Sequence, residues 1–486
     1  MYVGAAMMAA IEGLWIELAT LVSLVISAVL IANVILRKRN VSAAIGWVGL
    51  ILLSPVMGSL TYLLFGINRI RRRAQRLHRP ALSSAGITHD TETLLSAHLA
   101  QDNAHLSYLA RVIDGLSPTA LSAGNRIIPL RNGDEAYPEM IRAIEAAEHS
   151  VVLQTYIFRV DAAGEMFVDA LDRARKRGVA VRVLIDGVGV LYSLPSIRWR
   201  LRARDIPYGL FMHSLWPWRM PYLNLRNHQK ILVVDGRVGF TGGLNIGLDN
   251  LLARQPERPV RDLHFRIEGP VVVQMADAFA SDWQFTTNET IEFADWEKSA
   301  AFEGTAVARG LTGGPDQEAD KLRSVLVAAV SEARRSIRIV TPYFLPDEVL
   351  VSSLRIAAWR GVSIDIIVPG ASNLPFVDWA SSAWLDVLIE AGCRFWRSAP
   401  PFDHSKMLVV DGAWSFIGSV NWDDRSLRLN FEFNIESYDV ALAGALLKIS
   451  DAMLADARPV TLGSLNSRSL PVKLRDGVAR LFSPYL

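Results

Sequence analysis

The apolar positions of the chain follow two different patterns. Two long apolar runs come first, and no charged residue lies between Leu18 and Leu36 or between Val41 and Ile67. Each run meets the roughly 20 apolar residues that a helix needs to cross a bilayer. Further along, the apolar residues come in short runs separated by amphipathic stretches. The pattern predicts a membrane segment followed by folded domains.

The predicted membrane segment is a transmembrane helical hairpin over residues 1–67, with helices at about 14–36 and 41–66. A cleaved signal peptide would carry a positive charge before its apolar run, and no Lys or Arg precedes Arg37. Pro55 and Gly58 can kink the second helix, so a re-entrant hairpin that does not cross the bilayer stays open as an alternative. A buried core hairpin is disfavoured because both runs are too long and too uncharged.

Positive charge on either side of the second apolar run predicts its orientation. Three cations lie in Arg37-Lys38-Arg39, whereas residues 69–79 contain six arginines: Arg69, Arg71, Arg72, Arg73, Arg76 and Arg79. The larger cluster favours a cytoplasmic catalytic region. It can also attract anionic lipid head groups.

The rest of the chain alternates strand and helix patterns, and does so twice. The predicted order is strand, helix, strand at 149–158, 163–178 and 179–187, and again at 335–344, 346–361 and 362–370. This alternation predicts an α/β fold. A recurrence after about 180 residues is too long for a solenoid and indicates two tandem domains. We place a basic, then polar helical connector at 68–120 and the two domains at 121–300 and 301–486.

Composition adds few constraints. Apolar residues make up 51% of the chain, mean hydropathy is +0.22 and the formal net charge is +2. The single cysteine, Cys393, excludes an internal disulfide and a thiolate metal cluster. No extended basic groove pattern points to nucleic acid.

The strongest signal is a segment that occurs twice. "HQKILVVDGRVGFTGGLN" (228–245) and "HSKMLVVDGAWSFIGSVN" (404–421) agree at ten of eighteen positions. Residues two apart on a strand face the same side, so His228 projects with Lys230, and His404 with Lys406. If the halves pack about a pseudo-twofold axis, both pairs meet in one cleft. Asn245 and Asn421 close the two copies and are predicted to join it.

Such a cleft suits a phosphodiester. One imidazole can attack phosphorus while the other protonates the leaving alkoxide, and the lysines can stabilise charge on the non-bridging oxygens. The acid needs a carboxylate that raises its pKa, and the candidates downstream of each copy are Glu432 and Asp262. The motif supplies no carboxylate cluster for Mg²⁺ or Ca²⁺, so we expect neither a metal nor a cofactor.

The two copies of H-x-K-x4-D-x6-G-[GS]-x-N resemble the phospholipase D superfamily, with Asp235 and Asp411 as the motif aspartates. More narrowly, the chain resembles bacterial cardiolipin synthases over nearly its full length. The blocks that carry this resemblance are "LNLRNHQK", "RDLHFRIEGP", "GSVNWDDRSLRLNFE", the closing "RLFSPYL" and the apolar hairpin. The segment "GGLNIGLDN" departs by lacking the more usual acidic-aromatic ending, which leaves acceptor contacts there open.

The resemblance implies two phospholipase D-like domains with mixed, helix-flanked sheets, and a ping-pong transfer. A histidine takes the phosphatidyl group from one phosphatidylglycerol and releases glycerol, and a second phosphatidylglycerol then accepts it to give cardiolipin. It implies His228 as nucleophile, His404 as acid/base and a structural role for Asp235 and Asp411 in the turn after the strand. It also implies a multi-pass protein of the bacterial inner membrane that acts on anionic phospholipid and not on nucleic acid. A homo-oligomer stays open.

Three other functions remain as alternatives. One is a phospholipase D that hydrolyses its substrate or uses another acceptor or phosphatidylethanolamine. A phosphodiesterase or nuclease and a non-enzymatic membrane scaffold are disfavoured, by the hairpin and by the two intact motifs. We interpret His264 as either a site or a packing residue, the loop 215–224 as either packing or interfacial, and the remaining histidines as structural: His78, His89, His98, His105, His149 and His213.

Overall fold

The computed structural model describes residues 2–38, 41–63, 91–212, 225–291, 304–315, 320–382 and 384–483. The chain divides into two units, Met1–Arg73 and Ala74–Leu486. Several sequence features lie outside the described residues: the arginine cluster at 69–79, the loop 215–224 and the histidines His78, His89 and His213.

The first unit is helical. It contains α1 (Tyr2–Arg37), α2 (Val41–Leu53) and α3 (Pro55–Thr61). Within the described residues, the part of α1 from Gly13 to Arg37 is the one helix long and apolar enough to cross a membrane. The second long helix expected at about 41–66 is not present, because Pro55 cannot continue α2 and instead starts a new helix. A hairpin of two transmembrane helices is therefore not shown.

The two short helices fold back on α1. Leu30 and Val34 of α1 form a buried cluster with Ile51 and Tyr62, and the Tyr62 hydroxyl lies 3.1 Å from Asn33 Oδ1. A Cβ on Gly58 would lie 2.3 Å from a backbone oxygen of α2, so this close approach requires glycine. The turn residues anticipated from sequence thus shape this unit.

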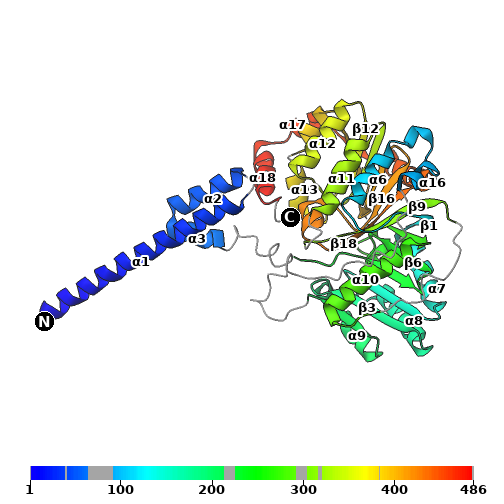
Figure 1. Ribbon diagram of the computed structural model, residues 1–486, viewed down its shortest axis with the longest axis horizontal. Coiled ribbons are helices and arrows are strands. Elements are labelled where there is room, and N and C mark those ends of the chain that lie inside the picture. Colours follow the sequence, from blue (N-terminus) through cyan, green and yellow to red (C-terminus); the bar gives the residue numbers. More distant parts are fainter. Residues whose placement is uncertain are drawn as a thin grey trace. The chain divides into compact units, whose positions relative to one another are not determined.

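The second unit is built on one continuous mixed sheet, which has fifteen strands in the described residues. It joins two halves, with β9 and β1 side by side at their boundary (Figure 1). The two halves repeat the same strand order outward from this boundary. The first half runs β1 (Ser122–Arg131), β8 (Leu263–Glu268), β6 (Val238–Gly242), β5 (Ile231–Val234), β2 (Ser150–Thr155), β3 (Ala180–Asp186) and β4 (Tyr208–Phe211). The second half runs β9 (Ala306–Gly313), β18 (Glu432–Tyr438), β16 (Trp414–Gly418), β15 (Met407–Val410), β10 (Ser336–Val340), β12 (Ser363–Pro369) and β13 (Arg394–Ser398), and β19 (Arg458–Val460) adds an edge strand.

The matching order means that the two halves are tandem copies of one fold. They meet where β1 pairs antiparallel with β9. In the first half β2, β3 and β4 are parallel, as are their counterparts β10, β12 and β13 in the second half, whereas the strands nearer the centre and the edge strand β19 pair antiparallel. The apolar runs predicted from sequence supply the parallel strands, which are buried on both faces and therefore read as continuous apolar stretches.

Helices cover both faces of each half. One face of the first half packs on α7 (Asn132–Glu145), α8 (Ala162–Lys176) and α9 (Ile197–Ala203). The second half packs in the same way on α6 (Leu106–Asp114), α11 (Lys321–Glu332), α12 (Glu348–Trp359) and α14 (Leu385–Glu390). On the other face, α10 (Val271–Thr287) of the first half contacts β9, and α16 (Val440–Ala455) of the second half contacts β1. Each half therefore helps to cover the other, which holds their shared boundary in place.

Candidate active site

The two motif histidines face each other across the boundary between the halves. His228 lies just before β5, and His404 lies just before the matching strand β15. Their ring centroids are 6.5 Å apart and the rings are nearly perpendicular, at 84°. Both line one cavity of about 580 Å³, together with Asn245, Asn421 and Asp262. The structure thus brings together five of the residues predicted from sequence.

Short backbone pairings between the halves set this geometry. Asn227 bridges Phe431, and the His228 N–H donates to the Phe431 carbonyl oxygen at 2.8 Å. The residue after Phe431 is Glu432. Because this pairing is fixed, the carboxylate from the second half lies beside the histidine of the first.

The same pairing occurs in the other direction. The short strand β14 (Phe402–Asp403) pairs with β7 (Val260–Arg261), and the His404 N–H donates to the Arg261 carbonyl oxygen at 2.8 Å. The next residue, Asp262, then lies beside His404. Each half therefore supplies the carboxylate for the histidine of the other half.

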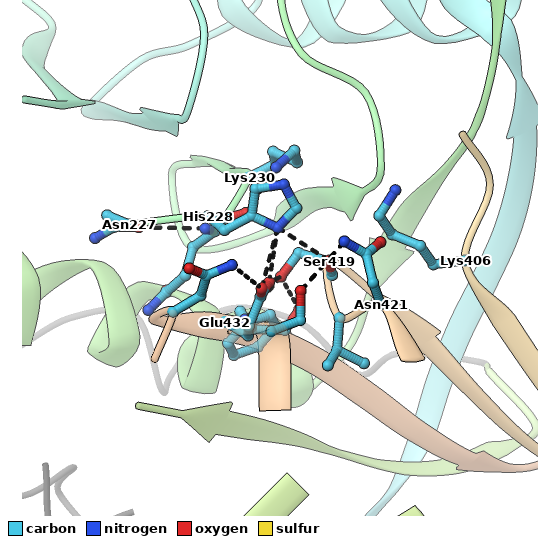
Figure 2. Close-up of polar contacts among 12 residues, drawn as sticks. Asn227, His228, Lys230, Lys406, Ser419, Asn421 and Glu432 are labelled. Atoms are coloured by element: carbon cyan, nitrogen blue, oxygen red, sulfur yellow. Dashed lines mark hydrogen bonds and ion pairs between the residues drawn. The ribbon is translucent and has the colours of Figure 1, made fainter. Parts of the chain in front are cut away.

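Both imidazoles are held through Nδ1. His228 Nδ1 lies 3.0 Å and 3.1 Å from the two Glu432 oxygens and 3.1 Å from the Ser419 carbonyl oxygen (Figure 2). His404 Nδ1 lies 2.8 Å from Asp262 Oδ2. The Ser419 carbonyl oxygen and the Asp262 carboxylate only accept hydrogen bonds, which assigns the proton to Nδ1 in both rings. Lys406 Nζ also lies 3.0 Å from His404 Nδ1. Nε2 is then the nitrogen left for chemistry.

The side chains of Glu432 and Asp262 differ in length, and the motif residue beside each of them differs accordingly. At the position where the second copy has Ser419, whose hydroxyl donates to Glu432, the first copy has Gly243. A Cβ on Gly243 would lie 2.0 Å from Asp262 Oδ1. The shorter aspartate therefore needs the glycine, which gives a physical reason for the [GS] variation within the motif.

Burial and nearby positive charge keep both histidines neutral. Burial, with the charges of Lys230 and Lys406, holds the pKa of His228 well below its usual value. Burial and the Lys406 charge lower the pKa of His404 to about 4, although Asp262 opposes that shift. Burial also raises the pKa of Glu432 to about 7. His228 therefore starts as a neutral base, which is the form that a nucleophile needs.

The lysines lie deeper than sequence reasoning placed them. Lys230 Nζ donates to the His228 carbonyl oxygen at 2.7 Å, and Lys406 Nζ donates to the His404 carbonyl oxygen. Neither is among the described residues that line the cavity. Burial lowers the pKa of Lys230 to about 7 and that of Lys406 to about 8.

The motif aspartates lie away from the cavity. Asp235 and Asp411 follow β5 and β15, at the opposite ends of these strands from the histidines, with φ of 51° and 53°. Asp235 accepts hydrogen bonds from the backbone N–H groups of residues 148, 149 and 150. Asp411 accepts from those of residues 334, 335 and 336 and is also bonded to His105 at 2.7 Å. Their bonds join neighbouring strands and do not reach the histidines.

The two asparagines lie on the cavity wall. Asn245 Oδ1 accepts a hydrogen bond from the Ile157 N–H at 3.3 Å. Asn421 Nδ2 lies 3.2 Å from the Ser426 hydroxyl, and its buried Oδ1 has no partner in the described part of the chain. In the described residues, no group of three or more His, Cys, Asp or Glu is placed to hold a metal ion.

Several wall residues were not singled out from sequence. Tyr156 packs edge-on against His228 with centroids 5.3 Å apart, and Tyr343 packs against His404 at 6.2 Å. Arg226 and Arg425 also line the cavity. Each tyrosine falls within a predicted strand segment, 149–158 or 335–344, but lies beyond the end of the observed strand, β2 or β10. Buried His264, with its pKa lowered by burial to about 3, is not among the described wall residues.

Comparison with known proteins places this site in a family. Residues 140–283 and 326–454 match the model described as cardiolipin synthase, PLD-like domain. The chain is 30% identical over 470 residues to cardiolipin synthase 1 of Bacillus cereus, across 93% of this chain and 91% of that protein. The chain belongs to the cardiolipin synthase family. A family member from Geobacillus sp. (strain WCH70) is 33% identical over 482 residues, across 95% and 92% of the two chains.

The family match covers the site described above. The two matched segments contain His228 with Asp262, and His404 with Glu432. The structure of phosphatidylserine synthase from Haemophilus influenzae Rd KW20 has a similar fold, with a TM-score of 0.61 at 16% identity, over 78% of this chain and all of that one. Residues 25–66 match the model described as Phospholipase_D-nuclease N-terminal. With the apolar α1, this match indicates a membrane-associated cardiolipin synthase family member.

Proposed function

We propose that this chain transfers a phosphatidyl group from one phosphatidylglycerol to a second, giving cardiolipin and glycerol through a phosphatidyl-histidine. The observation that carries the proposal is the pair of imidazoles facing each other at 6.5 Å, each oriented from behind by a carboxylate. The family membership adds the phospholipid substrate class.

In the first step, neutral His228 Nε2 attacks phosphorus. The N–P bond forms, the bond from phosphorus to the glycerol oxygen breaks, and His404 gives its Nε2 proton to that oxygen. A phosphodiester carries a negative charge, which raises the pKa of an imidazole next to it and, with Asp262, favours protonation of His404. The pKa of His228, which burial and the lysine charges lower, supports its role as nucleophile because it keeps the imidazole neutral.

In the second step, the roles of His404 reverse. The hydroxyl of the second phosphatidylglycerol gives its proton to His404 and attacks phosphorus, and the bond to His228 breaks. The product is cardiolipin, and both imidazoles return to their starting protonation. Asn245 and Asn421 on the cavity wall can hold the non-bridging oxygens.

The lysines take part by charge. Each ammonium group donates a hydrogen bond to the carbonyl oxygen of the histidine in its own motif, and neither lysine is among the described residues that line the cavity. We propose that a bound phosphodiester draws one or both toward its non-bridging oxygens, because lysine is a flexible point charge. Asp235 and Asp411 support the strands and take no chemical step.

The cavity suits a lipid on one side. Beside His404 its wall is aromatic and apolar, with Phe402, Leu374 and Phe376. Leu374 and Phe376 are 47% and 36% exposed, so an apolar edge is open to an acyl chain.

We further propose that residues 1–67 anchor the chain as a multi-pass segment in the bacterial inner membrane. Residues 68–120 then connect this segment to tandem domains 121–300 and 301–486. The arginines at 69–79 favour a position of these domains on the cytoplasmic side.

Purified full-length protein with vesicles of phosphatidylglycerol alone tests the activity. We expect cardiolipin and free glycerol in equal amounts. Phosphatidic acid without cardiolipin would instead show a hydrolase, and no turnover would contradict the proposal. The double variant His228→Ala with His404→Ala is the background control.

A further inference from the structure

The two walls at the mouth of the cavity differ, although the halves are tandem copies. Two residues before the motif histidine, the first copy has Arg226 and the second has Phe402. Four residues after the motif asparagine, the second copy has Arg425 and the first has Asp249. All four line the cavity. One wall therefore carries two guanidinium groups where the other carries a ring and a carboxylate.

The carboxylate on the apolar wall is already paired. Arg159 Nη1 lies 2.9 Å from Asp249 Oδ2. On the other wall, Arg226 and Arg425 both line the cavity and interact electrostatically with each other. Burial and the charge of Arg226 together lower the pKa of Arg425, and Asp423 offsets the shift only in part. Two cations in one partly buried wall create a position that favours an anion.

One of these arginines also has an unused donor. Arg226 Nη1 is buried and has no hydrogen-bond partner in the described part of the chain. A buried donor without a partner costs free energy that a ligand can recover. The carboxylate of Asp186 interacts electrostatically with Arg226, but it already accepts hydrogen bonds from the backbone N–H groups of residues 188, 189 and 227.

The position of Arg226 in the chain indicates how far its side chain lies from the histidines. Burial increases along this segment of the chain: Arg226 is half-buried, His228 is 8% exposed and Lys230 is 2% exposed. The segment thus runs from the mouth of the cavity to below its floor. Residues two apart in an extended chain are separated by about 6.6 Å. The phosphorus atoms joined through one glycerol by a P–O–C–C–C–O–P bridge lie a comparable distance apart.

We propose that Arg226 and Arg425 form a second phosphate subsite, which binds the phosphodiester of the acceptor phosphatidylglycerol while its terminal hydroxyl reaches down to the phosphorus between the two histidines. The inference rests on the proposed function. Arg226 and Arg425 take no chemical step, and they select an acceptor that carries its own phosphate over water or a neutral alcohol. Planar guanidinium groups suit a phosphodiester because each can donate two parallel hydrogen bonds.

Changing only the acceptor tests this subsite. Wild type, Arg226→Gln and Arg425→Gln are each given phosphatidylglycerol as donor in mixed micelles, with and without ethanol as a neutral acceptor. We expect each variant to lose about tenfold or more of cardiolipin formation, whereas phosphatidylethanol formation stays within about twofold. Arg425→Lys should recover part of the loss. Arg142→Gln, an exposed charge on α7, is the matched control for both products.

A soluble acceptor separates head-group recognition from lipid packing. Deacylated phosphatidylglycerol carries the same phosphodiester without acyl chains, and transfer to it should show the same loss in both variants. Equal loss of cardiolipin and phosphatidylethanol would overturn the subsite, because the arginines would then serve the donor or the fold. No loss of either would overturn it as well. A wild-type protein that makes phosphatidylethanol but no cardiolipin would instead refute the proposed function.

Discussion

The replacement of Glu432 by glutamine probes the carboxylate that one half lends to the other. Glu432 is fully buried, and both of its oxygens lie within 3.1 Å of His228 Nδ1. It also accepts hydrogen bonds from the Ser419 hydroxyl and from Asn430 Nδ2, at 3.1 Å for the latter. Glutamine keeps the size of the side chain and removes its charge, so it tests electrostatics with little change in packing.

The structure limits the size of the effect. Replacing the carboxylate that orients a catalytic histidine by its amide costs about 10⁴ in kcat where the wrong tautomer results. Here the Ser419 carbonyl oxygen, 3.1 Å from His228 Nδ1, still holds the correct tautomer. The pKa of Glu432, raised by burial to about 7, also means that its charge is only partly present at neutral pH. We therefore expect a loss of about 100-fold in kcat, or about 2.7 kcal/mol.

Initial rates of cardiolipin formation over a range of phosphatidylglycerol mole fractions separate kcat from KM. The loss should lie in kcat with KM within about threefold, because Glu432 touches the imidazole and not the lipid. Glu432→Asp keeps the charge and serves as the matched variant, and thermal unfolding of each protein checks its fold. A normal kcat in a folded Glu432→Gln protein would refute the exchanged-carboxylate reasoning.

Three further predictions concern residues around the site. Gly243→Ser should lower kcat by at least tenfold without large loss of stability, because its Cβ would lie 2.0 Å from Asp262 Oδ1 and displace that carboxylate; a normal rate would show that Asp262 can move freely. The alkaline limb of kcat/KM should fall between about pH 7 and 9, as Lys230 and Lys406, with pKa values of about 7 and 8, lose their charge; a flat profile to pH 9 would contradict a role for the ammonium groups. Asp411→Asn should cost about 2 kcal/mol of unfolding free energy at pH 7, measured by denaturant titration. Burial raises the pKa of Asp411, but hydrogen bonds from three backbone N–H groups and His105 lower it overall. The stability that Asp411 contributes is therefore present above pH of about 4 and is lost as the pH falls through the lowered pKa. Equal losses of unfolding free energy for the variant at pH 7 and at pH 2 would contradict this reasoning.

Sequence reasoning reached the repeated fold because local patterns encode it. The predicted segments 149–158 and 179–187 contain β2 and β3, and 163–178 matches α8 to within two residues at each end. Their later counterparts contain β10, α12 and β12. The agreement arises because buried parallel strands and amphipathic helices have distinct apolar periods. The break between α2 and α3 followed from Pro55, although its result, two helices too short to cross a bilayer, went beyond the expected kink.

Only part of the active site could be predicted from the sequence. A duplicated motif predicts two histidines in one cleft, and the structure has them there. The exchange of carboxylates between halves depends on the pairing of Asn227 with Phe431, a contact between segments far apart in the chain. The inward turn of Lys230 depends on a rotamer, which no sequence pattern specifies. Arg226 stood within a block noted for its resemblance to the family, but only its place on the wall indicates a use for it.

The most direct test of the central claim is the location of the covalent intermediate. Full-length protein is mixed with phosphatidylglycerol, quenched at alkaline pH within one turnover and digested, and the peptides are analysed by mass spectrometry. The account predicts a phosphatidyl adduct on the peptide that contains His228, absent from His228→Ala. An adduct on the His404 peptide would reverse the two roles, and cardiolipin formation without any adduct would contradict transfer through a histidine.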